Sequence, residues 1–134
     1  MTRGRGFFWL AVALIVTMPV LAATFSPLLA WRDPVYIAAG LAGIIALALM
    51  FLQPVMVGAY DTLGLERARA RLLHRAIGVT VVAAVLLHVA GLWVTSPPDV
   101  IDVLLFRSPT PFGVWGALAL WAVLGAALVA AGRR

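Results

Sequence analysis

The sequence predicts an all-α membrane protein that folds as a bundle of four transmembrane helices. Hydrophobic residues make up 64% of the 134 residues, and charged residues make up only 11%. Four apolar stretches are long enough to cross a bilayer as helices, which takes about 20 residues each. The basic residues are all arginine, and most of them lie beside alternate ends of these stretches, as is typical of membrane proteins with basic cytoplasmic segments.

The first predicted helix covers residues 7–25 and follows the basic residues Arg3 and Arg5. Its apolar run is long enough to span the hydrocarbon core of a membrane. A cleaved signal peptide is the alternative, because a basic start, an apolar run and small residues near Ala23 also describe one. We expect a membrane helix, since the apolar run is long for a signal peptide.

The second predicted helix covers residues 36–59 and begins after a short polar segment. Its Ala39 and Gly43 are small residues one turn apart, a pattern that lets another helix pack closely. Gln53 and Pro54 near its far end have two interpretations. They line a slot for a cofactor or quinone, or they mark the approach to the membrane interface, where glutamine bonds a neighbour.

The remaining chain is predicted as a basic loop, a third helix at 72–94, a polar turn and a fourth helix at 112–131. The basic loop spans residues 60–71. Residues 99–106 mix apolar side chains with aspartates, so this segment is predicted either as a short helix lying in the membrane interface or as a plain surface loop. Small residues in the fourth helix, Gly113 and Ala117, again permit close packing.

The distribution of arginine predicts that both termini lie in the cytoplasm. Eight arginines then fall on the cytoplasmic side: Arg3, Arg5, Arg67, Arg69, Arg71, Arg75, Arg133 and Arg134. Only Arg32 and Arg107 remain on the outer side. Cytoplasmic segments carry the excess of basic residues in membrane proteins, so the predicted topology has four crossings, with the protein in a bacterial-type inner membrane and in contact with its lipid.

The third predicted helix contains both histidines of the chain, His74 and His88, fourteen residues apart. On a helix this spacing is a rise of about 21 Å and a rotation within roughly 40° of whole turns, so both imidazoles share one face at different depths. That distance excludes a single metal ion held by both side chains. Imidazole is a common axial ligand of haem iron, and the absence of cysteine excludes thiolate ligands and iron–sulfur clusters. We therefore expect two separate haem sites.

Other residues near the histidines are candidates for the same sites. Gly78, Ala84 and Gly91 would let a flat macrocycle approach the helix backbone, although close helix packing also explains small residues there. Arg71 and Arg75 flank His74, and arginine pairs well with the carboxylates of haem propionates. The cytoplasmic excess of basic residues explains both arginines equally well.

The run Arg71 to Gly78, RLLHRAIG, followed by Leu87-His88-Val89, resembles the third helix of the ferric-reductase-like transmembrane domain. This family includes haem-binding membrane subunits of the bacterial methionine sulfoxide reductase system, ferric reductases and the membrane part of NADPH oxidases. The similarity covers nearly the whole chain. It implies a bundle that binds two haems b and passes electrons across the membrane, with His74 on the inner haem and His88 on the outer haem.

The resemblance also implies ligands that this chain does not contain. Family members hold each haem between a histidine of the third helix and one of the fifth, whereas this chain has no second histidine pair. We expect it to correspond to the first part of a six-helix domain, or to receive the second pair from a partner chain. Met18, Met50 and Met56 are the other candidate iron ligands within the predicted helices.

Two functions from different classes follow from the sequence. The first is an oxidoreductase component for transmembrane electron transfer, which passes electrons from a cytoplasmic or membrane donor toward a periplasmic acceptor such as ferric iron. Its donor would be a separate flavin and NAD(P)H protein, or membrane quinol, because the chain has no glycine-rich nucleotide-binding loop. The second is a haem-free accessory or assembly subunit that packs against another membrane protein.

Overall fold

The computed structural model describes residues 2–133, and the side chains from residue 6 onward. Every element in this range is helical, and none is a strand. The elements in chain order are α1 (Thr2–Thr24), η1 (Pro27–Leu29), α2 (Pro34–Gly58), α3 (Tyr60–Leu63), α4 (Arg67–Thr95), α5 (Pro97–Leu104) and α6 (Pro111–Gly132). Four of them, α1, α2, α4 and α6, are long and apolar enough to cross a membrane. The all-α fold class with four candidate spans is thus confirmed.

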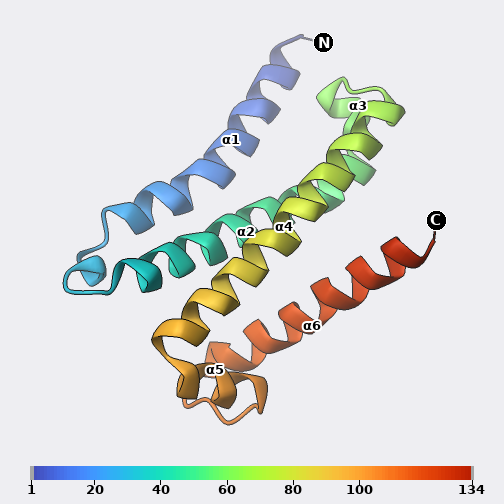
Figure 1. Cartoon of the computed structure of the whole chain (residues 1–134). Coiled ribbons are helices and arrows are strands. Elements are labelled where there is room, and N and C mark those ends of the chain that lie inside the picture. The colour runs from blue at the N-terminus through green and yellow to red at the C-terminus, as the bar shows by residue number, and fades with distance from the viewer. Residues whose placement is uncertain (1, 134) are drawn as a thin grey trace.

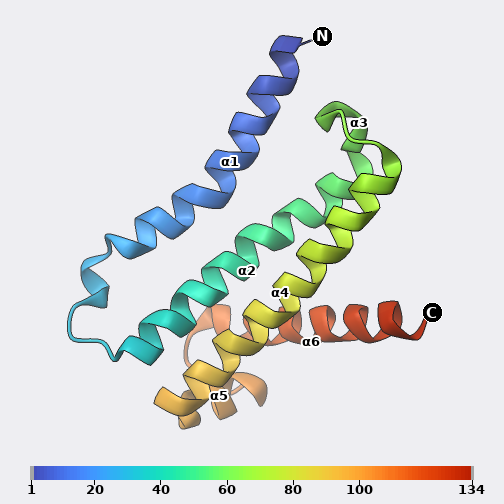
Figure 2. The same ribbon diagram turned by 45° about the horizontal axis from the view of Figure 1, so that its top comes forward.

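The packing of α2 against α4 is the centre of the fold. Both Figure 1 and Figure 2 show these two helices side by side over most of their length. Small residues of α2, including Ala39 and Ala46, are almost completely buried, and Val81 and Ala84 of α4 are buried as well. Small side chains let two helix backbones approach closely, which supplies the van der Waals contact that holds helices together in lipid. The close packing expected at Ala39 is confirmed.

The first and last spans are less enclosed than this central pair. α1 packs against α2 and α3, and α6 contacts α4 and α5. The buried residues of α6, Gly113 and Ala117, lie in its first two turns. Figures 1 and 2 show α6 diverging from α4 toward its C-terminal end. Much of the apolar surface of both helices is therefore free to meet lipid or another protein.

The segment 60–71 differs from the predicted loop, because most of it is helical. Residues Tyr60–Leu63 form α3, and α4 already begins at Arg67. The turn between them is made at Gly64, whose φ of 68° lies in the left-handed region that glycine adopts easily. Arginine and alanine are strong helix formers, so the sequence from Arg67 onward extends α4 beyond its apolar part. The basic side chains consequently lie on a helix of defined orientation.

The polar segment after α4 contains the helix α5, which settles the choice between a short helix and a loop at 99–106. The helix begins two residues earlier than predicted, at Pro97, since proline fits the first turn of a helix, where no N–H partner is needed. Val100 is buried, whereas Asp99 is exposed. A similar boundary effect starts α2 at Pro34, because the Oδ1 atom of Asp33 accepts a 2.7 Å hydrogen bond from the N–H of Val35.

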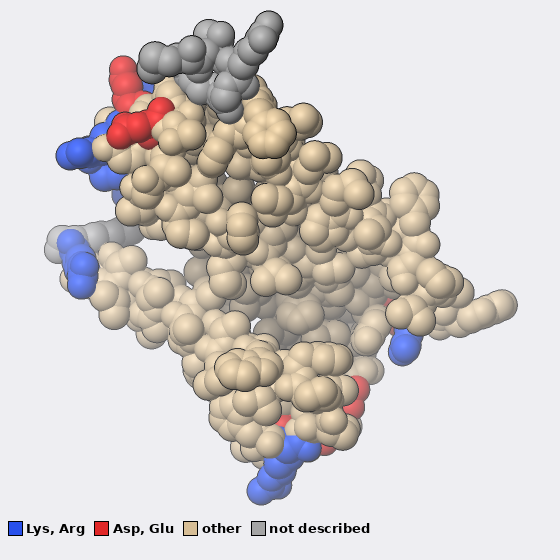
Figure 3. Space-filling view, turned by 180° about the vertical axis from the view of Figure 1, so that it is seen from behind, with Lys and Arg blue, Asp and Glu red and all other residues tan. Residues whose placement is uncertain are grey.

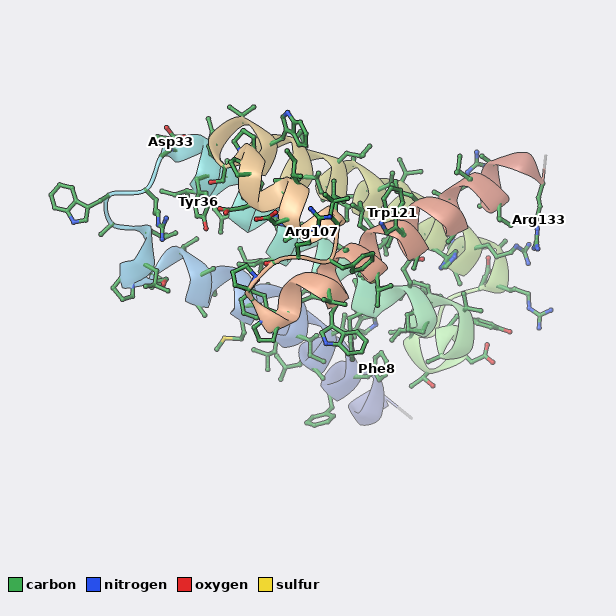
Figure 4. The ribbon with its side chains drawn as sticks, turned by 90° about the horizontal axis from the view of Figure 1, so that it is seen from below. Phe8, Asp33, Tyr36, Arg107, Trp121 and Arg133 are labelled. Carbon is green, nitrogen blue, oxygen red and sulfur yellow. The ribbon has the colours of Figure 1, made fainter. Side chains whose placement is uncertain are left out.

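Charged side chains lie at the two ends of the bundle, with an apolar belt between them. Figure 3 shows this distribution on one face of the molecule. In Figure 4, Tyr36 and Arg107 lie on segments at the α5 end, whereas Arg133 lies at the opposite end of α6. Such a belt is the surface expected for a protein that crosses a membrane several times. The side chains of Arg3 and Arg5, and residue Arg134, lie outside the described part.

Candidate functional site

His88 projects from the C-terminal half of α4 onto the backbone of α2. Its Nδ1 lies 2.8 Å from the carbonyl oxygen of Ala39. The ring can come this close because Gly43, one turn along α2, has no side chain. A Cβ atom at Gly43 would lie 2.7 Å from Nδ1 and 2.9 Å from Cε1 of the ring, closer than real contacts allow. The small residues Ala39 and Gly43 thus accommodate an imidazole as well as a helix.

His74 makes a corresponding contact near the other end of the pair formed by α2 and α4. Its Nδ1 lies 3.3 Å from the carbonyl oxygen of Gln53, and the side-chain Nε2 of Gln53 donates a hydrogen bond of 3.3 Å to the carbonyl oxygen of His74. Gln53 therefore bonds a neighbouring helix, as in the second interpretation of the Gln53 and Pro54 pair. This reciprocal pair of bonds links α2 and α4 and holds the imidazole against α2.

The two contacts define the chemistry available to the rings. A carbonyl oxygen only accepts hydrogen bonds, so the Nδ1 atoms of His74 and His88 must carry the proton. In the neutral form of each ring, the lone pair is then on Nε2. Within residues 2–133, neither Nε2 atom makes a hydrogen bond, and neither is buried without a partner. Neither Nε2 atom is therefore fully buried, and in this tautomer each carries the lone pair that a metal ligand requires.

A large apolar cavity adjoins His88. It has a volume of about 560 Å³ and lies between α2, α4, α5 and α6. Its lining is almost entirely apolar, with polar side chains from His88, Tyr36, Ser96, Asp99 and Thr110. Figure 3 shows the molecule hollowed between α6 and the other helices. Cavities of about 300–1,000 Å³ with a few polar groups are typical sites for cofactors and small molecules.

A second cavity adjoins His74 at the α3 end of the bundle. Its volume is about 300 Å³, and its lining includes charged side chains. Met56, Val57 and Ala70 give it an apolar floor, while Tyr60, Arg67 and Arg71 add polar side chains to its lining. The two histidines therefore line separate cavities.

The other predicted site residues do not all lie at the two cavities. Arg71 lines the cavity of His74, whereas Arg75 is exposed and lines neither cavity. A Cβ atom at Gly91 would lie 2.7 Å from the Cβ of Ala39, so this glycine permits the contact between α4 and α2. Ala84 is buried, and the open side of Gly78 faces the side chain of Gln53 at 3.5 Å. Close helix packing thus accounts for Gly91.

Several side chains at the sites were not predicted as site residues. Arg67 and Tyr60 line the cavity of His74, and Gly43 faces the ring of His88. The spacing of Arg67, Arg71 and His74 at four and three residues was a usable signal, because it places all three on one helix face. A loop at residues 60–71, as the sequence analysis predicts, would give Arg67 and Arg71 no common face with His74. Two of the methionines that the sequence analysis names as candidate iron ligands also lie at the cavities. Met56 lines the cavity of His74, and Met50 lines the cavity of His88.

Within residues 2–133, no three His, Cys, Asp or Glu side chains lie together as a site for a bare metal ion. A porphyrin would supply most of the iron ligands itself, so single histidines are sufficient protein ligands for a haem. A scan against models of protein families, a search of curated proteins and a search of solved structures each found no match for this chain.

Proposed function

We propose that this chain is a membrane haem b protein that carries electrons across the bilayer, with His74 and His88 as axial ligands in two separate centres. One observation carries the proposal, namely the shared geometry of the two imidazoles. Each Nδ1–H donates to a backbone carbonyl of α2, and neither Nε2 is fully buried. Metal-binding histidines commonly have such a partner, because it fixes the tautomer and orients the ring.

The cavity beside His88 suits the group that its imidazole would hold. The apolar lining beside His88 suits the apolar faces of a porphyrin and keeps water away from the ring. Haem iron, when bound, supplies the one-electron chemistry. The protein would contribute the two Nε2 ligands, about 21 Å apart along α4, and the apolar surroundings that influence the potential of each centre. Such a pair would divide the crossing of the membrane into shorter electron-transfer steps.

The second axial ligand of each centre is part of the proposal. Each cavity contains one histidine among the described residues. We infer that bis-histidine ligation uses imidazoles from further helices of the same domain or from a partner chain. Met50 and Met56 offer the alternative, since each lines a cavity together with a histidine and thioether sulfur also ligates haem iron.

The proposal also includes the orientation of the protein in the membrane and its electron donor and acceptor. The arginine-rich end of the bundle, with α3 and the start of α4, would lie in the cytoplasm of a bacterial-type cell. His74 would then belong to the inner centre and His88 to the outer centre. Electrons would enter from a flavin and NAD(P)H protein or from quinol, and would leave to a periplasmic acceptor. The described helices offer their apolar faces to the surrounding lipid.

The test compares haem content and absorbance spectra of the purified wild type, His74→Ala and His88→Ala. We expect the wild type to show a Soret band, and each variant to lose a spectroscopically distinct part of it, because each removes the ligand of one centre. Thr80→Ala, which removes an exposed hydroxyl of α4 that bonds only Ala76, is the matched control and should retain both parts. Complete loss in both single variants, with the helical fold intact, would show one shared site.

The second candidate function is a haem-free accessory subunit that packs against another membrane protein. The position of Gly91 favours it, because close packing on Ala39 explains this glycine without a cofactor. A purified protein without a Soret band, which also fails to take up added haem, would support this function. Spectra of a bis-histidine low-spin haem in the monomeric chain alone would instead contradict the inferred need for imidazoles from another segment.

A further inference from the structure

The cavity beside His74 combines an imidazole with two guanidinium groups on one helix face. Arg67, Arg71 and His74 all line it, at spacings of four and three residues along α4. These positions lie within roughly 60° of one another around the helix and span a rise of about 10 Å. The imidazole therefore lies nearer the middle of the bundle, and the two arginines lie toward the α3 end.

The arginines are arranged to receive a negatively charged group. The Nε and Nη2 atoms of Arg67 donate hydrogen bonds of 3.2 Å and 3.1 Å to the hydroxyl oxygen of Tyr60, which orients the guanidinium. Because this oxygen accepts both bonds, the O–H of Tyr60 remains available as a donor. The guanidinium of Arg71 has no hydrogen bond or ion pair among the described side chains. Two cations and one hydroxyl donor thus border the same space.

No carboxylate lines this cavity, although Asp61 lies near enough to Arg67 to interact with it electrostatically. The acidic residues nearest in sequence, Asp61 and Glu66, are exposed and lie outside the lining. Glu66 lies 3.9 Å from Arg69, an arginine that also lies outside it. The floor is apolar, since Met56 and Ala70 are almost fully buried there. The cavity therefore suits an amphiphilic acid, with an apolar body beside Met56 and acidic groups beside the arginines.

We propose that Arg67 and Arg71, together with Tyr60, bind the carboxylate groups of the porphyrin that His74 holds. This inference rests on the proposed function and adds to it a site that binds the carboxylates of the porphyrin. Guanidinium groups form paired, charge-assisted hydrogen bonds with carboxylates. The role expected of Arg75 passes to Arg67, because Arg67 lines the cavity of His74 whereas Arg75 is exposed and lies outside the lining. His74 and the arginine pair thereby recognise two different parts of one ligand.

The experiment measures the binding of two probes to the full chain in a non-ionic detergent. Metal-free protoporphyrin has both carboxylates but no iron, and its binding is followed by fluorescence. Iron protoporphyrin dimethyl ester has iron but no free carboxylate, and its binding is followed by absorbance. The first probe reports on the arginines and the second on His74, so the two contributions are measured separately. His88→Ala is the common background, so that the outer cavity does not bind the ester through a histidine.

We expect the double variant Arg67→Gln and Arg71→Gln to bind metal-free protoporphyrin at least about tenfold more weakly, because several charge-assisted hydrogen bonds are lost. Binding of the iron ester should stay unchanged. The matched control is the double variant Arg69→Gln and Arg133→Gln, which removes the same charge from exposed positions outside both cavities. It should bind both probes as the parent does. Tyr60→Phe should weaken metal-free protoporphyrin by less than the double variant.

Several results would overturn the inference. Equal weakening in the control variant would show a general effect of charge, and a loss in Arg75→Gln alone that equals the loss in the double variant would return the role to Arg75. Displacement of the porphyrin by phosphatidylglycerol, but not by phosphatidylcholine, with an arginine-dependent affinity equal to or higher than that of the porphyrin, would assign the site to a lipid phosphate. A different result concerns the proposed function: failure of the iron ester to bind, with arginine-dependent binding of the metal-free acid, would refute the ligand role of His74 without overturning the carboxylate site.

Discussion

At the scale of single residues, the tautomer and the orientation of the two imidazoles depend on contacts made by α2. The carbonyl oxygens of Ala39 and Gln53 accept from the Nδ1 atoms and leave the lone pairs on the Nε2 atoms. Gly43 matters as much as the acceptor at His88, because only a residue without a side chain leaves room for the ring. The residue that makes room for the imidazole of His88 is thus a glycine on another helix.

We expect Gly43→Ala to displace the ring of His88 and to weaken haem binding at that centre by roughly tenfold or more, as loss of an orienting partner commonly does. The new Cβ would otherwise lie 2.7 Å from Nδ1. Haem titration measures the affinity, and ¹⁵N NMR of the imidazole reports the tautomer without any haem. Gly58→Ala is the control on the same helix, because a Cβ at Gly58 would meet nothing within 4 Å. An unchanged tautomer in Gly43→Ala would contradict the proposed support.

At the scale of helices, the fold depends on the interface between α2 and α4. Ala39 has two roles there, since its side chain packs against Gly91 and its carbonyl accepts from His88. Gln53 adds a polar link at the other end of the interface through its bond to the carbonyl of His74. Helix packing and imidazole orientation therefore depend on the same contacts, so a shift of one helix along the other would disturb both.

We expect Gly91→Ala to destabilise the protein by about 1–3 kcal/mol, the usual effect of an extra methyl group in a close-packed interface. The added Cβ would lie 2.7 Å from the Cβ of Ala39. Thermal unfolding in detergent, followed by circular dichroism, measures the change. Gly125→Ala in α6, where a Cβ would meet nothing within 4 Å, should have little effect. Loss of haem with no change in stability would instead support a role of Gly91 beside the macrocycle.

At the scale of the whole molecule, the N-terminal end of α1 lies at the α3 end of the bundle. Figure 1 shows the N-terminus and α3 at one end and α5 at the other. Arg67, Arg69 and Arg71 lie at the α3 end, and Arg107 follows α5. The cavity with the arginines is thus at the end that the charge distribution predicts to be cytoplasmic.

Reporter fusions test this orientation. Fusions after Gly64 and after Arg134 should both report the cytoplasm, and a fusion after Ser108 should report the periplasm, because basic segments are retained on the cytoplasmic side. The Ser108 fusion is the internal control for export of the reporter. A periplasmic signal at Gly64 would reverse the orientation and exchange the inner and outer assignments of His74 and His88.

The sequence by itself determined the all-α class, the four spans and the separation of the two histidines along one helix. These features depend on local composition and on helical geometry, and both can be read without knowing what a helix contacts. The short helix after α4 was one of two predicted alternatives. The extension of α4 to Arg67 was missed, because arginines at the end of an apolar stretch fit a loop as well as a solvated helix turn.

Only the tertiary structure decided which residues of α2 meet the histidines and which arginine shares a cavity with His74. Nearly all positions on these helices are apolar, and lipid tails are as apolar as the side chains, so hydropathy does not indicate which face meets a partner. That choice depends on the fit of small residues, such as Ala39 against Gly91, across the two helices. The register set by this fit brings Gln53 to His74 and Gly43 to His88.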